Sequence, residues 1–88
     1  MNISGLWLPD VIYNVHMIYI YFQADDEYYE LKEILYLLGT GLFESAYIRY
    51  VALIPRLEYV ARQHNYLNTD IFADLLNTKD SLNRFLKQ

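Results

Sequence analysis

The longest stretch of helical periodicity extends from Leu42 to His64 and constrains the fold more than any other feature of the sequence. Apolar side chains recur there at spacings of three and four residues, on a face formed by Phe43, Tyr47, Tyr50, Ile54, Leu57 and Ala61. Such spacing is typical of a helix that packs against a core. Pro55 lies inside this stretch and removes one backbone hydrogen bond. We therefore predict a long central helix that is kinked between Val51 and Pro55.

The N-terminal part of the chain is compatible with a helix or a strand. Pro9 and Asp10 suit the first turn of a helix. Apolar residues then follow at helical spacing, with a predicted core face of Leu8, Ile12, Val15, Tyr19 and Phe22 and an opposite stripe of Asp10, Asn14 and Tyr21. Because β-branched and aromatic residues dominate Val11 to Phe22, a strand is the alternative.

Two further segments show helical spacing. Asp25, Asp26 or Glu27 could cap a helix that ends at Gly39-Thr40-Gly41, with an inner face of Tyr28, Leu31, Leu35 and Leu38. Asn68 or Thr69 could cap the last helix, with Ile71, Phe72, Leu75 and Leu76 turned inward. The polar residues 77–81 leave open whether that helix continues to the C-terminus.

The composition favours one folded domain over residues 1–88. Hydrophobic residues make up 55% of the 88 residues and charged residues 20%, so the chain has enough apolar surface for a core. We predict an all-α, compact bundle of about four helices, with an α+β fold containing an N-terminal strand as the alternative.

Several classes of protein are disfavoured by composition. The chain has no cysteine, which excludes disulfides and thiolate sites and fits a cytoplasmic protein. The most apolar segment, Leu6 to Phe22, is interrupted by polar residues and has no basic residue before it, so we expect neither a membrane helix nor a signal peptide.

Charge is distributed unevenly, although the net charge is only −4. Met1 to Ser45 carries most of the acids and a single base, Lys32, and the other bases follow this segment. The acidic half would repel a phosphate backbone. A helix-turn-helix between Asn68 and Leu86 would have three basic residues, but three aspartates share that region. We expect nucleic-acid binding to be the weaker alternative.

No pattern of residues indicates catalysis. His16 lies on an apolar segment, and His64 follows Arg62 at the predicted end of a helix, where a cation is favoured. Asp26, Glu30 and Glu33 could face one cation, but neither histidine has the glutamate three positions earlier that di-metal bundles use. We expect no enzyme activity, no metal and no cofactor.

Ten tyrosines are the most unusual feature of the composition. Phenol rings combine apolar area with a hydroxyl and are enriched in protein interfaces. We expect half of them to be core or rim residues, namely Tyr13, Tyr19, Tyr28, Tyr47 and Tyr50. The other half are interface candidates because they fall nearer the predicted polar faces, namely Tyr21, Tyr29, Tyr36, Tyr59 and Tyr66.

Together, these patterns predict a small acidic module that binds another protein. We expect an inhibitor or antidote-like regulator that masks a basic surface of its target. The predicted contacts are acidic residues with neighbouring aromatic anchors, namely Asp25, Asp26, Glu27, Tyr29, Glu30, Glu33 and Tyr36. The alternative is a structural subunit that forms a homodimer through its tyrosine-rich surface.

Overall fold

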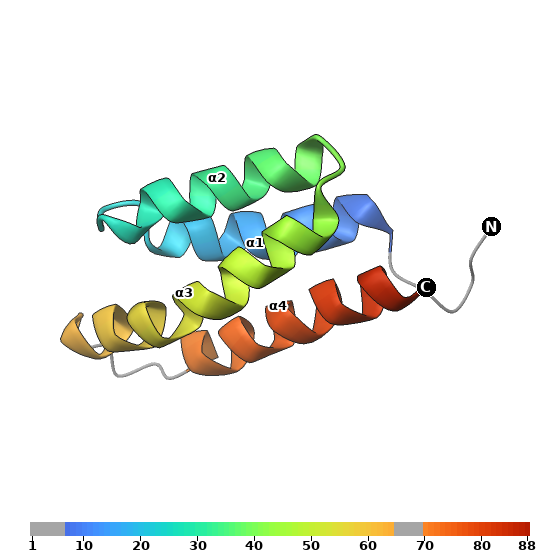
Figure 1. Cartoon of the computed structure of the whole chain (residues 1–88). Helices are drawn as coiled ribbons and strands as arrows, with labels where there is room; N and C mark the ends of the chain where they lie inside the picture. Colours follow the sequence, from blue (N-terminus) through green and yellow to red (C-terminus); the bar gives the residue numbers. More distant parts are fainter. Residues whose placement is uncertain (1–6, 65–69) are drawn as a thin grey trace.

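The computed structural model describes residues 7–64 and 70–88, which form a bundle of four antiparallel helices (Figure 1). The helices are α1 (Leu8–Tyr21), α2 (Glu27–Gly39), α3 (Phe43–Gln63) and α4 (Asp70–Lys87). No strand occurs among the described residues. The predicted all-α bundle is therefore confirmed, and the region of the alternative strand is helical.

No helix is central in the bundle. α1 packs against α2 and α4, and α3 packs against the same two helices. The predicted central position of the Leu42 to His64 segment is thus wrong, because α3 occupies one corner of the bundle. α3 is nevertheless the longest helix and passes through Pro55 without interruption. Pro55 lies on its exposed side.

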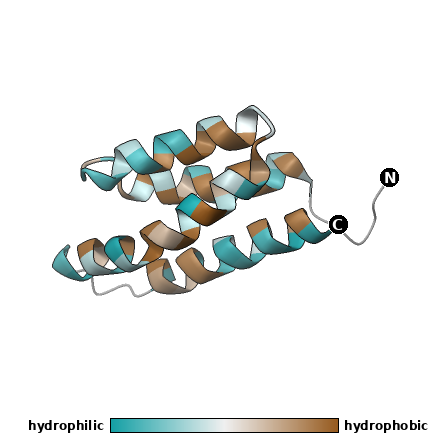
Figure 2. Ribbon diagram, in the orientation of Figure 1, coloured by the Kyte–Doolittle hydropathy of each residue, from teal (hydrophilic) through white to brown (hydrophobic). Residues whose placement is uncertain are grey.

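The core is built from one apolar stripe per helix, and brown, hydrophobic residues recur along all four helices in Figure 2. Because each helix faces two neighbours, its buried stripe points between them. In α1 the buried face is therefore rotated relative to the predicted one. Leu8, Ile12 and Tyr19 are half-buried, and Val11 and Ile18 are buried instead. The largest fully buried side chains are Tyr50, Phe22, Leu31, Ile34, Leu38, Leu57, Leu75 and Leu82.

The predicted glycine break ends α2 at Gly39. Gly41 has a φ of 84°, a left-handed conformation that other residues adopt at a cost. The Thr40 hydroxyl donates to the carbonyls of Tyr36 (3.0 Å) and Leu37 (3.2 Å), which also accept backbone hydrogen bonds from the amides of Thr40 and Leu42. At the other end of α2, Asp26 is the N-cap residue but makes no capping hydrogen bond with its side chain.

The polar residues 77–81 form part of a continuous α4. Two of them, Thr78 and Ser81, are buried, and the Asn14 amide donates to the Ser81 hydroxyl (3.1 Å) across the contact between α1 and α4. Leu76, which was predicted to face inward, is exposed. Since α4 is unbroken, residues 70–87 contain no turn for the helix-turn-helix considered from sequence. The candidate caps Asn68 and Thr69 lie outside the described residues.

Tyr50 links α3 to α4 in the centre of the bundle. Its hydroxyl donates to the Leu75 carbonyl (2.9 Å), and its side chain is fully buried. Burial raises the pKa of Tyr50 above its usual value near 10, because the phenolate would lose its hydration. A hydrogen bond with Thr78 opposes this rise in pKa, and the Asp74 carboxylate adds to it. The folded bundle therefore holds Tyr50 in its neutral form.

We predict that Tyr50→Phe lowers the free energy of unfolding by about 1 kcal/mol at neutral pH, through loss of its hydrogen bond. Above pH 10 the difference from wild type should shrink. The unfolded phenol ionises there while the buried one does not, so wild type loses stability as pH rises, by up to about 1.4 kcal/mol per pH unit. Urea unfolding from neutral to alkaline pH measures both effects. Tyr59→Phe, at an exposed position, is the control and should match wild type throughout.

Candidate functional site

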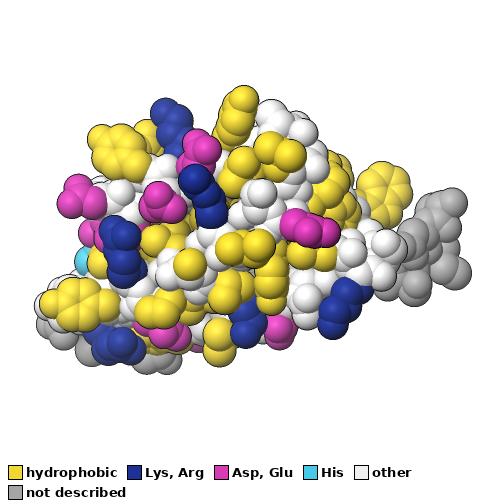
Figure 3. Space-filling model, in the orientation of Figure 1, with side chains coloured by type: hydrophobic (Ala, Val, Ile, Leu, Met, Phe, Trp, Pro, Cys, Tyr) yellow, Lys and Arg dark blue, Asp and Glu magenta, His cyan; other side chains and the backbone are white. Residues whose placement is uncertain are grey.

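The predicted acidic site lies at the start of α2 and along the side of α2 that adjoins α3. This surface faces the viewer in Figure 3, where hydrophobic side chains are interspersed with charges of both signs. Its acidic side chains fall into two groups, because some reach basic partners on α3 and others do not. This division decides which carboxylates a partner protein could contact.

Glu27 is the best-compensated carboxylate of the site. It is only 8% exposed, and its Oε2 accepts a hydrogen bond from Nη2 of Arg56 at 2.9 Å. The Arg56 side chain is itself largely exposed, so it covers the carboxylate from the solvent side. Glu27 was predicted to contact a partner, but it is occupied within the chain. A buried carboxylate requires such a partner because its desolvation is costly.

Two other predicted contact residues also pair with α3 or its C-terminal end. Oδ1 of Asp25, in the turn between α1 and α2, lies 2.8 Å from Nε2 of His64. Both side chains are mostly buried, and the rings of Tyr21 and Phe22 lie beside the imidazole. Oε1 of Glu33 lies 3.7 Å from Nη1 of Arg49, with both side chains about half exposed. Asp25 is thus engaged, and Glu33 is only loosely compensated.

Asp26 and Glu30 are the predicted carboxylates that form no ion pair among the described residues. Asp26 is exposed and Glu30 is half-buried. The predicted aromatic anchors flank them on the surface, with Tyr29 69% and Tyr36 63% exposed. The surface thus keeps its aromatic residues but carries less uncompensated negative charge than the sequence suggested.

α3 contributes four residues to this surface: Tyr59 was an interface candidate in the sequence, and Ile48, Arg49 and Arg56 were not assigned. Ile48 and Tyr59 are about as exposed as Tyr29. Arg49 and Arg56 lie between them and α2, as their ion pairs show. We call the whole surface the α2–α3 face; it comprises Asp26, Glu27, Tyr29, Glu30, Glu33, Tyr36, Ile48, Arg49, Arg56 and Tyr59. Ile48 lies off the apolar stripe of α3, and that departure was the available signal in the sequence.

The burial of the described tyrosines follows the prediction except at Tyr13 and Tyr21. Tyr50 is buried, Tyr19, Tyr28 and Tyr47 are half-buried, and Tyr29, Tyr36 and Tyr59 are exposed, all as predicted. Tyr13 is exposed and Tyr21 half-buried, which reverses both predictions. Tyr19 and Tyr28 have ring centroids 5.0 Å apart, and their mutual hydrogen bond raises the pKa of Tyr19. Tyr66 lies outside the described residues.

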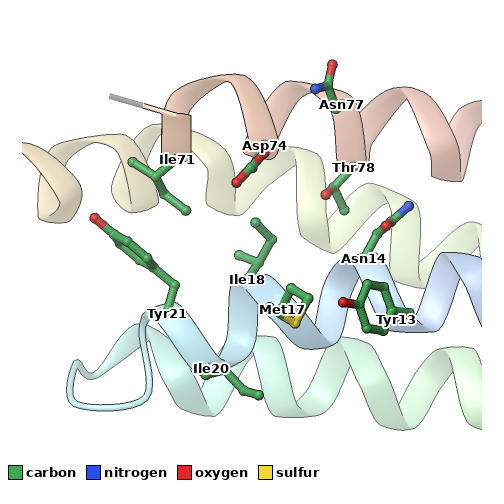
Figure 4. Close-up of a pocket in the computed structure, with 10 residues that line it drawn as sticks. All are labelled: Tyr13, Asn14, Met17, Ile18, Ile20, Tyr21, Ile71, Asp74, Asn77 and Thr78. Carbon is green, nitrogen blue, oxygen red and sulfur yellow. The ribbon is translucent and has the colours of Figure 1, made fainter. Parts of the chain in front are cut away.

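A second candidate site is a cavity of about 510 Å³ between α1 and α4 (Figure 4). We call it the α1–α4 groove; it is lined by Tyr13, Asn14, Met17, Ile18, Ile20, Tyr21, Ile71, Asp74, Asn77 and Thr78. Tyr13, Met17 and Ile20 are large side chains exposed on the outer side of α1. Sequence analysis missed the groove because its two walls are far apart in the chain.

Within residues 7–64 and 70–88, no cluster of three potential metal ligands occurs. In the same part of the chain, every helix is too short or too polar to cross a lipid bilayer. The class that the structure defines is an all-α four-helix bundle. Comparison of the chain with protein-family models, with curated proteins and with solved structures found no match. Any proposal of function therefore rests on the geometry of the two candidate sites.

We predict that Arg56→Gln lowers the free energy of unfolding by about 1–3 kcal/mol, because it leaves the buried Glu27 carboxylate without its charged partner. Arg49→Gln should cost at most about 0.5 kcal/mol, since its pair with Glu33 is long and exposed. Urea unfolding of both variants measures the difference. Glu27→Gln combined with Arg56→Gln should recover part of the loss. Equal effects of the two arginine variants would contradict this account of the α2–α3 contact.

Proposed function

We propose that this chain is a non-catalytic module that binds another protein through the α2–α3 face. The observation that carries the proposal is the exposure of Tyr29, Tyr36 and Tyr59 on one charge-compensated surface. Tyrosine and arginine are the residues most enriched among energetic hot spots of protein interfaces. Large aromatic side chains that stay exposed, beside arginines fixed by ion pairs, fit such an interface.

The charge of this face supports a partner with a basic surface, although less strongly than the sequence did. Asp26 and Glu30 remain without ion-pair partners among the described residues, and Glu33 is half exposed. These carboxylates would steer a basic surface toward the tyrosines and orient it. An inhibitor or antidote-like regulator that covers a basic region of its target fits this chemistry. The cysteine-free sequence is compatible with a cytoplasmic target.

The test is affinity capture from an extract of the source organism, with bound proteins identified by mass spectrometry. Wild type should retain a specific protein. Tyr29→Ala combined with Tyr36→Ala should weaken its binding at least about thirtyfold, since removal of one hot-spot aromatic residue costs about 2 kcal/mol or more. Asp26→Asn combined with Glu30→Gln should slow association and remove much of its dependence on salt.

Tyr13→Ala is the matched control, because Tyr13 is similarly exposed but lies on α1, away from the α2–α3 face. This variant should retain the captured protein as wild type does. If the tyrosine pair on α2 can be removed without weakening the capture, the α2–α3 face is not the binding surface.

Self-association is the second candidate function, and a stripe on α3 favours it. Ile48, Ala52, Pro55 and Tyr59 are all exposed and recur at spacings of three and four residues. The two smaller side chains, Ala52 and Pro55, lie between the two larger ones. Two antiparallel copies of α3 could therefore approach closely, with Ile48 of each copy against Tyr59 of the other.

We predict that, if the chain dimerises through this stripe, sedimentation shows a dimer that is insensitive to salt. Ile48→Asp should then convert it to a monomer, because a carboxylate would be buried at the contact. Asp80→Lys, at an exposed position on α4, should leave the dimer intact. Wild type that sediments as a monomer at every concentration would exclude this function and leave the α2–α3 face available to another protein.

A further inference from the structure

The α1–α4 groove has a mainly apolar wall on α1 and a mainly polar wall on α4. In Figure 4, Ile18 and Tyr21 of α1 point toward α4, and Ile71, Asp74 and Thr78 of α4 point toward α1. Ile20 and Asn77 belong to the rim and point away from this space. The interior is thus bounded mainly by aliphatic and aromatic side chains, with a few polar groups on one side. This combination is typical of sites for small ligands.

Asp74 is the charged residue that lines the groove, and its carboxylate sets the chemistry of a ligand. The side chain is exposed to solvent and forms no ion pair among the described residues. No lysine or arginine lines the groove. An anionic ligand would be repelled, whereas a cation would gain a charge-assisted hydrogen bond. Across the groove, the Asn14 amide is already engaged as a donor to Ser81.

The groove, with a volume of about 510 Å³, has the size of a small-molecule site. Specific sites for small molecules have volumes of about 300–1,000 Å³. The exposed Met17 and the half-buried Tyr21, both on the α1 wall of the groove, are therefore suited to contact the apolar body of a compact ligand.

We propose that the α1–α4 groove binds a small organic amine, with its apolar body against Met17 and Tyr21 and its ammonium group paired with Asp74. The site lies on the opposite pair of helices from the α2–α3 face. Its occupation is independent of the proposed protein interface, so failure of either proposal leaves the other intact.

The test uses three probes of similar size at neutral pH: phenethylamine, which is a cation, phenethyl alcohol, which is neutral, and hydrocinnamate, which is an anion. Each is titrated into the full chain with isotope-labelled isoleucine methyl groups, observed by NMR. Phenethylamine should shift the methyl signals of Ile18 and Ile71 and leave that of Ile48, on the α2–α3 face, in place. It should bind about tenfold or more tightly than the alcohol, because one charge-assisted hydrogen bond contributes about that much to affinity. Hydrocinnamate should bind most weakly.

Two variants examine the role of the carboxylate. Asp74→Asn should reduce the preference for the amine over the alcohol to about twofold or less, because the remaining hydrogen bond is neutral. Asp80→Asn, at an exposed aspartate of α4 that does not line the groove, should preserve the preference.

A third variant blocks the groove itself. Met17→Lys places a tethered ammonium group at the groove and should abolish binding of phenethylamine. Met17 is exposed, so this variant should fold normally.

Four results would overturn the proposal. The first is equal binding of the three probes, which would mean that charge has no role. The second is an amine preference that persists in Asp74→Asn, which would place the ammonium group elsewhere. The third is a set of shifts centred on Ile48 in place of Ile18 and Ile71. Absence of any phenethylamine binding would also reject the site.

Discussion

The bundle depends on an apolar interior that each helix shares with two neighbours. This arrangement requires every helix to bury a stripe that points between its neighbours, and so it fixes which residues are left outside. Two polar side chains in the interior form hydrogen bonds between helices: the Tyr50 hydroxyl donates to the Leu75 carbonyl, and the Asn14 amide donates to the Ser81 hydroxyl. Each of these contacts joins two helices. They therefore add specificity to packing that hydrophobic burial alone would leave less defined.

Charge pairing between α2 and α3 complements this core. α2 is rich in acids and α3 supplies arginines, so the uneven charge distribution along the chain becomes a local match in space. Because Glu27 is buried, its pairing with Arg56 contributes to stability, since an uncompensated carboxylate there would be costly. Some of the acidic side chains that were predicted to contact a partner thus form ion pairs within the bundle instead. The exposed large side chains of the α2–α3 face are mainly aromatic.

The two candidate sites lie on different pairs of helices and differ in chemistry. The α2–α3 face is aromatic and carries four acidic side chains against two arginines, and aromatic residues and arginine are both enriched in protein interfaces. The α1–α4 groove is narrower and has a single carboxylate beside aliphatic side chains. A bundle of this size can carry both because only one stripe of each helix is needed for the core. The outer sides of α1 and α3 are free to hold exposed apolar residues.

The sequence by itself determined the helices, because periodicity, glycine and charge act over a few residues. The run that became α3, the break at Gly39-Thr40-Gly41 and the exposed anchors Tyr29 and Tyr36 were all predictable in this way. The tertiary structure decided which helices are neighbours, and hence the rotation of the α1 stripe. It also brought Arg56 to Glu27 and Asp74 opposite Ile18, pairs that lie far apart in the chain. Such contacts depend on how four amphipathic stripes share one interior, which no local pattern of residues specifies.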